Sequence, residues 1–324
     1  MITRVATAGS CFAQHISRYL QKSDFHYYVA EPGHPILPEA HRLANNYGVF
    51  SARYGNIYTA RQLRQLIERA YGIFCPVEGS WQVSDGVFVD PFRPSAQPGG
   101  FISDFELQLD REQHLASVRT LFETLDIFIF TLGLTECWVS RADGAAFPVC
   151  PGVAGGSFDE ARYSFINQTV DDVVTDMAVF LDNLSRVNPS AEVILTVSPV
   201  PLAATARADQ HVLAATTYSK AVLRVATEML ASSYSNISYF PSYEVITASF
   251  SRGSYYAGDL RNVLETGVSH VMRLFMKHAC AESHPGRGAN VNNSVWADAD
   301  GDNYEKIAAN LVQVECDEAA LDRH

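Results

Sequence analysis

The residues best suited to covalent chemistry lie at the end of the first hydrophobic run of the chain. Ser10 follows Gly9 where a β-like run, residues 4–8, gives way to apolar residues at helical spacing. A hydroxyl there lies beside the backbone N–H groups of a helix N-terminus, which favour a developing oxyanion. The same position suits a helix N-cap, so this turn leaves both a nucleophilic and a capping role open for Ser10. Cys11 competes for the nucleophilic role, because a thiol at a helix N-terminus is a strong nucleophile.

Two later clusters also hold polar groups at the ends of predicted elements. Gly133, Thr135 and Glu136 follow a short apolar run and supply a backbone N–H, a hydroxyl and a carboxylate. A Gly-x-Thr-Glu sequence after a strand is also an ordinary helix start. Asp259 and Asn262 are three residues apart just before a helical run, so the side chain at 259 can orient the one at 262.

Alternating strands and helices must position these groups. The hydrophobic spacing predicts strands over residues 4–8, 127–132, 193–197 and 237–240. It predicts helices over residues 59–71, about 111–125, about 170–184, about 214–232 and a last one ending at 277. This alternation predicts the α/β class, as a three-layer α/β/α sandwich with a mainly parallel sheet. Ligands bind at the carboxyl ends of such strands, so we expect the turns after residues 8, 132, 197 and 240 to meet.

The domain is expected to span residues 1–284, with an irregular insertion near residues 76–105 that is rich in proline and glycine. Residues 285–324 shift to Gly, Asn, Asp and Ala, which predicts a flexible C-terminal segment with a short helix near residues 304–314. Asp298, Asp300 and Asp302 alternate as in a calcium loop, but the glycine and glutamate of that loop are missing.

Composition excludes several classes of partner. With 36 acidic against 24 basic side chains, the net charge of −12 argues against nucleic acid. The longest uncharged apolar stretch, residues 193–206, is interrupted by two prolines, so no membrane span is expected. The N-terminus shows no secretory signal, and we expect a soluble, cytoplasmic protein. The six cysteines form no C-x-x-C pair and do not cluster with histidine, so we expect no structural zinc. No other metal and no organic cofactor is expected.

The motif Gly9-Ser10-Cys11-Phe12-Ala13 is the signature of the GSCFA family. The chain resembles that family over about residues 4–278, through the motif and the blocks 55–63, 90–94, 131–136, 196–202, 218–220 and 239–244. The GSCFA family looks like a distant branch of the SGNH (GDSL-like) hydrolases. That resemblance implies a flavodoxin-like sandwich with a shallow open site and a Ser-His-Asp constellation. SGNH relatives use it to hydrolyse or transfer acyl groups, often on carbohydrates.

The resemblance also implies roles for individual residues. Ser10 falls on the nucleophile turn, and a register one residue later would place Cys11 there. Gly55 looks like the backbone donor to the oxyanion, with Gly48 as the alternative. Gly133 and Thr135 fall in the block where SGNH enzymes use an asparagine side chain as a second donor, and the Thr135 hydroxyl can donate one hydrogen bond.

A few residues in the family-like blocks are candidates for binding or for purely structural roles. Arg93 can grip a sugar hydroxyl, carboxylate or phosphate, or it can close a structural salt bridge. Tyr243 is either a binding residue or part of the core, and Glu136 is a further possible binding residue. Lys220 is expected on a helix surface, paired with an acid.

The sequence departs from the family at the expected base. Relatives carry Asp-x-x-His, whereas here Asp259 is followed by Asn262, and an amide cannot take a proton from serine. Loss of a triad base costs on the order of 10⁴ to 10⁶ in rate. Three explanations stay open: a natural binding protein, a deliberate substitution that traps substrate, or a base from elsewhere. For the last, His270 is a candidate, although a capping or packing role on the following helix is the expected one, and Glu136 could serve only if burial raised its pKa. His15 faces a different direction on its helix and is expected to be structural.

The resemblance therefore implies a serine esterase or O-acyltransferase that passes an acyl-serine to water or to a sugar hydroxyl. Its partners would be a small-molecule or carbohydrate ester and an acyl donor. The alternative is a non-catalytic domain that binds a glycan or metabolite in the same pocket.

Overall fold

The central sheet has four strands, all parallel, in the order β1-β4-β8-β9. They are β1 (Val5–Gly9), β4 (Ile127–Leu132), β8 (Glu192–Val197) and β9 (Ile237–Tyr239). The computed structural model describes residues 3–22 and 26–281, so the segment 285–324 and its expected helix lie outside the described residues. The four strands match the predicted ones to within a residue or two, and the prediction of a mainly parallel sheet is confirmed.

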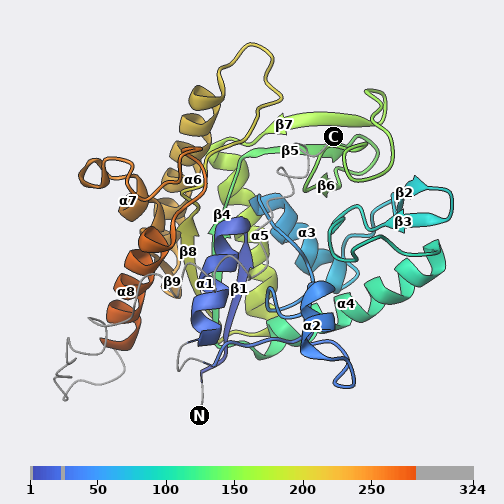
Figure 1. The fold of residues 1–324 in the computed structure, drawn as a ribbon, viewed down its shortest axis with the longest axis horizontal. Coiled ribbons are helices and arrows are strands. Elements are labelled where there is room, and N and C mark those ends of the chain that lie inside the picture. The colour runs from blue at the N-terminus through green and yellow to red at the C-terminus, as the bar shows by residue number, and fades with distance from the viewer. Residues whose placement is uncertain (1–2, 23–25, 282–324) are drawn as a thin grey trace.

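Helices cover both faces of this sheet (Figure 1). One face packs against α3 (Ala60–Ala70), α4 (Asp104–Thr124), α5 (Val170–Val187) and α6 (Val212–Ser233). The other packs against α1 (Cys11–Lys22), α7 (Ser242–Thr247) and α8 (Glu265–Ala281). Strand β4 shows the alternation, because Phe128 and Phe130 enter the first core while Ile129 enters the second. The three-layer α/β/α prediction is therefore confirmed.

Several shorter elements lie outside this central sheet and its covering helices. The hairpin of β2 (Trp81–Ser84) and β3 (Val87–Val89) lies within residues 76–105, and α2 (Glu39–Ala44) and the 3₁₀ turn η1 (Ser249–Ser251) lie in connections. An antiparallel sheet in the order β6-β5-β7 runs outward past the end of β4 (Figure 1). Its strands are β5 (Glu136–Ser140), β6 (Ala146–Phe147) and β7 (Tyr163–Asn167). The sequence did not predict this sheet, and residues 133–136 lead into β5 rather than into a helix.

Side-chain caps set where the helices begin. Helix α3 starts at the predicted place, because the Thr59 hydroxyl accepts the Gln62 N–H while the Gln62 side-chain oxygen accepts the Thr59 N–H. The predicted start of α4 near residue 111 is wrong. The helix begins at Asp104, since the Ser103 hydroxyl accepts the N–H of Glu106 at 3.1 Å and caps an extra two turns.

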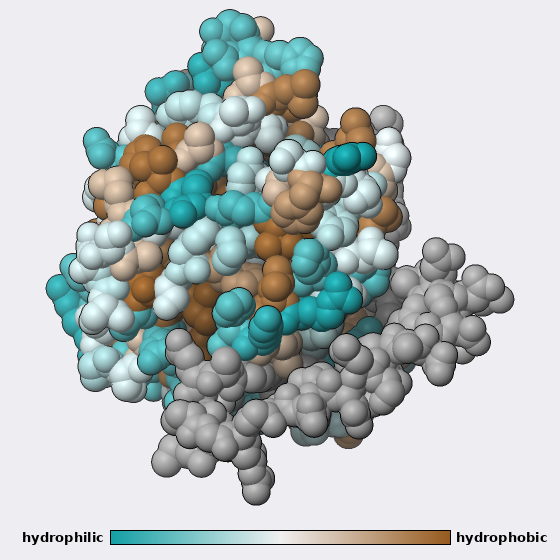
Figure 2. All heavy atoms as spheres, turned by 90° about the vertical axis from the view of Figure 1, so that its left-hand side faces the viewer, coloured by the Kyte–Doolittle hydropathy of each residue, from teal (hydrophilic) through white to brown (hydrophobic). Residues whose placement is uncertain are grey.

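The distribution of hydrophobic residues on the surface and the character of the helices bear on the partners of the chain. On the face that Figure 2 shows, hydrophobic residues occur in several separate patches among hydrophilic ones. Among the helices within residues 3–22 and 26–281, none combines the length and the apolar character that a membrane span needs.

The carboxyl ends of β1 and β4 approach each other closely at Gly9. This residue pairs with Thr131 and has a φ of +142°, which side chains rarely adopt. A Cβ at residue 9 would lie 2.7 Å from the Cβ of Thr131 and would also overlap the Thr131 carbonyl oxygen. The next N–H, that of Ser10, donates to the same carbonyl at 3.1 Å. Gly9 therefore lets the chain turn from β1 into α1 without opening the sheet.

We expect Gly9→Ala to lower the free energy of unfolding by about 3 kcal/mol, because it adds both backbone strain and overpacking. Urea denaturation at neutral pH measures the loss. The matched control is Gly144→Ala, where φ is also positive at +74° but a Cβ would meet no atom within 4 Å. This control should cost about 1 kcal/mol. Equal losses in the two variants would contradict the proposed close approach at Gly9.

Candidate active site

A hollow of about 230 Å³ opens at the carboxyl edge of the central sheet. The ends of three parallel strands line it, together with one residue before α3 and one from the loop before α8: Ser10, Cys11, Gly133, Leu134, Ser198, Val200, Pro201, Tyr58 and Arg261. The expectation that the turns after residues 8, 132 and 197 meet is thus confirmed. The turn after residue 240 contributes no lining residue.

The Ser10 side chain lies at this hollow without a hydrogen bond. The residue is 2% exposed, and its Oγ is buried with no partner within reach. Its carbonyl oxygen accepts the N–H of Ala13 at 2.8 Å, but its hydroxyl does not cap α1. An unsatisfied buried polar group costs about 1–3 kcal/mol, so such a group calls for an explanation. A hydroxyl that is available to contact a ligand explains the unsatisfied Oγ of Ser10 better than an N-cap role does.

Gly133 provides space next to Ser10. A Cβ at residue 133 would lie 2.8 Å from the Cβ of Ser10 and 3.3 Å from the ring of Tyr58. The N–H of Gly133 donates to the Tyr58 carbonyl at 2.9 Å, so it is not directed at Ser10. The Gly133 carbonyl accepts a 2.7 Å hydrogen bond from Nζ of Lys220, which is only 2% exposed. The expected surface position of Lys220 is therefore wrong: the lysine holds the turn beneath the hollow.

The other two predicted oxyanion donors lie apart from the lining residues. Gly55 has a φ of +68° and lies beside Arg93, although its neighbour Ile57 donates to the Gly9 carbonyl at 2.8 Å. The segment around Gly55 is thus tied to the end of β1. The Thr135 hydroxyl donates to Oδ1 of Asn167 at 2.6 Å, so this hydroxyl hydrogen is already used.

The predicted pair Asp259 and Asn262 lies at the rim. The side-chain amide of Asn262 donates to Oδ2 of Asp259, and both residues are exposed. Burial raises the pKa of Asp259, but the N–H groups of Arg261 and Asn262 and the Asn262 amide lower it more, so the net shift is downward. The loop docks on the turn after β8, because Tyr256 donates to the Pro199 carbonyl at 2.8 Å. Between the pair, Arg261 lines the hollow.

Neither alternative histidine lines the hollow. The Nδ1 of His270 pairs with the Tyr255 hydroxyl at 2.6 Å. Burial, and then the charge of Arg18, lower the pKa of His15 to about 4. The nine lining residues include no aspartate, glutamate or histidine. The hollow as described therefore holds a nucleophile candidate without a general base.

The three candidate binding residues also lie elsewhere. Arg93 is buried in an ion cluster, 3.0 Å from Asp90 and 2.6 Å from Asp110. Glu136 accepts the Thr205 hydroxyl at 2.7 Å, and Tyr243 lies half-buried on α7. For Arg93 the structure shows the salt bridge that the sequence analysis kept as the structural alternative.

Of the nine lining residues, the sequence analysis assigned a role to Ser10, Cys11 and Gly133; the polar or charged ones that it missed are Tyr58, Ser198 and Arg261. Ser198 had a usable signal, because it directly follows a predicted strand. Tyr58 and Arg261 had none, because their positions depend on how the segments before α3 and α8 dock on the strand ends. Within residues 3–22 and 26–281 no group of three or more His, Cys, Asp or Glu side chains is arranged to hold a metal ion.

Fold and site together define the class of protein. It is a three-layer α/β protein with a buried, unpartnered serine at the turn after the first strand of a parallel sheet. The GSCFA family model matches residues 4–275, and the chain belongs to the GSCFA family. No curated protein matches the sequence.

The buried ion cluster around Arg93 makes the free energy of unfolding depend on pH in the acidic range. Asp90 is buried, and although burial raises its pKa, Arg93 and Arg111 hold that pKa well below its usual range. A carboxyl whose pKa falls on folding stabilises the protein above its unfolded pKa of about 3.9. That contribution is lost as the pH falls below about 4 toward the folded pKa.

We expect Asp90→Asn to cost about 3–5 kcal/mol of unfolding free energy at pH 7, because it leaves buried arginines without their partner. The cost should shrink as the pH is lowered to 3. Urea denaturation of the wild type and the variant across this range measures it. The exposed Asp85→Asn is the control and should change little at any pH. A cost that does not vary with pH would contradict this role for Asp90.

Proposed function

We propose that the protein is an SGNH-like serine esterase or O-acyltransferase that acts on an acyl ester of a carbohydrate, with Ser10 as its nucleophile. The observation that carries the proposal is the buried Ser10 hydroxyl, which has no hydrogen-bond partner and belongs to a residue that lines the hollow at the strand ends. Membership of the GSCFA family supports it, since that family resembles the SGNH hydrolases.

The reaction that suits this site is acyl transfer through serine. The Ser10 oxygen attacks the ester carbonyl carbon, its proton passes to a base, and the alcohol leaves with a proton. Water or a sugar hydroxyl then attacks the acyl-serine and restores Ser10. The N-terminus of α1, which begins at Cys11, stabilises the negative charge on the carbonyl oxygen. Gly55, the donor that the family resemblance implies, does not line the hollow, so the backbone at the start of α1 is the proposed donor.

Residue 262 is the proposed position of the missing base. The Asn262 amide donates to Asp259, as the Nδ1–H of a triad histidine donates to its aspartate. An imidazole at residue 262 would keep that hydrogen bond and offer Nε2 as the proton acceptor. With asparagine there, the first proton transfer has no acceptor, so we expect slow turnover by the chain.

The second candidate function is ligand binding without turnover. The observation in its favour is the lining of the hollow, in which Arg261 is the charged residue and no carboxylate or imidazole occurs. A glycan or metabolite with a negative group would pair with this guanidinium.

The first experiment restores the base. We expect Asn262→His to raise the hydrolysis of 4-nitrophenyl acetate by about 10² or more, the scale that a general base contributes. Adding Ser10→Ala to that variant should abolish the gain. The control is Asn236→His, which places a histidine at an exposed position that does not line the hollow. It should change the rate of hydrolysis little. No gain from Asn262→His would sink the triad assignment and favour ligand binding.

A second experiment identifies the nucleophile. We expect intact-protein mass spectrometry after incubation with 4-nitrophenyl acetate to show one acetyl group on the wild type and on Cys11→Ala. Ser10→Ala should carry none at this site. Peptide mapping locates the group, since Cys11 lines the same hollow. Acetylation that survives Ser10→Ala and disappears in Cys11→Ala would make the thiol the nucleophile.

A further inference from the structure

A second hollow, of about 310 Å³, lies between the segment before α3 and the ion cluster. Its walls come from that segment, from α3, from the loop after β3 and from strand β6: Tyr54, Asn56, Ile57, Gln62, Gln65, Leu66, Arg69, Phe92 and Ala146. Residues 54–58 contribute to the walls of both hollows, because Tyr58 lines the one at Ser10. None of the residues in its wall has a role in the proposed acyl transfer.

Arg69 is the unusual residue of this hollow. It is 8% exposed, and its Nη2 is buried without a hydrogen-bond partner. Its guanidinium stacks on the ring of Phe92 at 3.8 Å. Burial lowers its pKa to about 9, so the side chain is still charged at neutral pH. Asp90 attracts this charge, but among the described residues no carboxylate forms an ion pair with Arg69. A buried cation without an ion pair is costly, and native proteins rarely keep one without a use.

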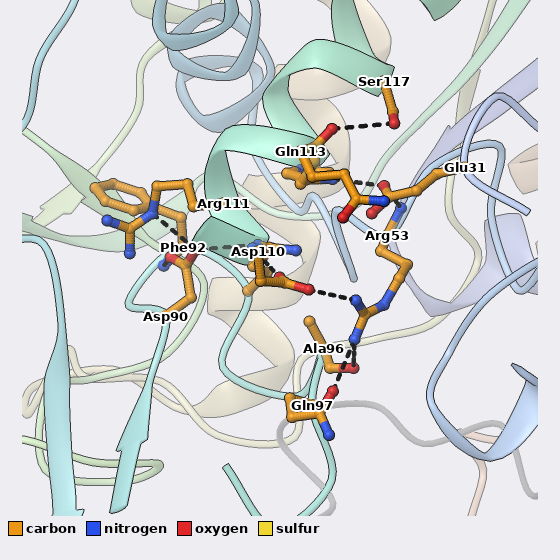
Figure 3. A network of polar contacts seen from close by, with 12 residues as sticks. Glu31, Arg53, Asp90, Phe92, Ala96, Gln97, Asp110, Arg111, Gln113 and Ser117 are labelled. Carbon is orange, nitrogen blue, oxygen red and sulfur yellow. Dashed lines mark hydrogen bonds and ion pairs between the residues drawn. The ribbon is translucent and has the colours of Figure 1, made fainter. Parts of the chain in front are cut away.

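The neighbouring carboxylates are already occupied, as Figure 3 shows for the cluster beside the hollow. Asp90 accepts hydrogen bonds from Arg93 and Arg111, both at 3.0 Å. Asp110 accepts from Arg53 at 2.8 Å and from Arg93 at 2.6 Å. Each carboxylate is thus shared by two arginines, and among the described residues neither forms an ion pair with Arg69. The region beside the hollow carries an excess of positive charge.

The third acid of the cluster, Glu31, is occupied as well. Its Oε2 accepts the backbone N–H of Arg53 at 2.7 Å and lies 2.7 Å from Nδ1 of His114. Burial and Arg93 lower the pKa of His114, while Glu31 opposes that shift.

The side-chain acceptor oxygens of the three amide residues in the wall are already occupied. The side-chain oxygen of Gln62 accepts the N–H groups of Tyr58 and Thr59. The side-chain oxygen of Asn56 accepts from Gln14 at 3.1 Å. Gln65 uses both ends of its amide, on Gly144 and Ala146. A wall with donors and few open acceptors suits a ligand that only accepts hydrogen bonds.

We propose that this hollow is an anion-binding site that takes a small carboxylate or phosphate group, with Arg69 as its anchor. The planar fork of the guanidinium matches the paired oxygens of either group. The site is separate from the acyl-transfer chemistry and requires no turnover at Ser10.

Isothermal titration calorimetry tests the site with the full chain, using inorganic phosphate and acetate in separate titrations at constant ionic strength. We expect one saturable site for at least one of the two anions, and the two titrations distinguish phosphate from carboxylate recognition. Arg69→Met should weaken binding by about tenfold or more. Arg186→Gln removes the same charge from an exposed position and should bind as the wild type does. Ser10→Ala should also bind normally, which separates this site from the Ser10 hollow.

Thermal unfolding without added anion separates a ligand-binding role of Arg69 from a structural one. Replacing a structural arginine would lower the midpoint of unfolding. We expect the midpoint of Arg69→Met to equal or exceed that of the wild type, because methionine can keep an apolar contact with Phe92 while the substitution removes a buried charge whose Nη2 has no hydrogen-bond partner. A clearly lower midpoint, or a variant that does not fold, would show that Arg69 is structural and would contradict the proposal. No saturable heat with either anion, or unchanged binding by Arg69→Met, would overturn it as well.

Discussion

The close approach of β1 and β4 at their carboxyl ends is the constraint on which the rest of the site depends. Two residues without side chains permit it: Gly9, where a Cβ would overlap Thr131, and Gly133, where a Cβ would lie 2.8 Å from that of Ser10. The same backbone then secures the segment before α3, since Ile57 donates to the Gly9 carbonyl. One pair of strand ends therefore fixes the position of Ser10 and a wall of each hollow.

Positive charge at both hollows contrasts with the composition of the chain. The protein has a net charge of −12, yet Arg261 lines the Ser10 hollow and Arg69 lines the second one. A third cation, Lys220, is buried beneath the Gly133 turn. Local cations in an acidic protein set up a field that draws anionic groups to particular places instead of to the whole surface. This arrangement suits both a developing oxyanion at Ser10 and an anion at Arg69.

Much of the fold was predictable because its signals are local. The strand of residues 127–132 is a short apolar run, and the glycine-serine turn follows from two adjacent letters. The sheet of β5, β6 and β7 was not predictable in the same way, because Glu136 pairs with Asn167 across a long stretch of chain. The burial of Lys220 was not predicted for a related reason. Only the folded turn supplies the Gly133 carbonyl, whose hydrogen bond to Nζ offsets the cost of burying the ammonium group.

The residues of the candidate site also divide into those with a local sequence signal and those placed by tertiary contacts. The position of Ser10 follows from a local motif, whereas the place of Arg261 in the hollow depends on a tertiary contact, in which its Nε donates to the Pro201 carbonyl at 3.3 Å. No pattern within residues 255–262 shows that this loop docks on the turn after β8. Sequence therefore pointed to the turn at Ser10, which lines the hollow, whereas the position of Arg261 follows only from the docked loop.

The rim loop explains how the site keeps its shape with asparagine at residue 262. Leu260 has a φ of +56° although it is not glycine, so the turn is strained. Asp259 holds the turn in place, because its Oδ1 accepts the N–H groups of both Arg261 and Asn262 at 2.9 Å. These bonds use backbone donors, which any residue at position 262 except proline supplies. The side chain at position 262 therefore does not decide whether the loop keeps its shape, and Arg261 stays in the hollow. A loop held by backbone donors in this way would accept a histidine at position 262 without rearranging its backbone, which is what the proposed base requires.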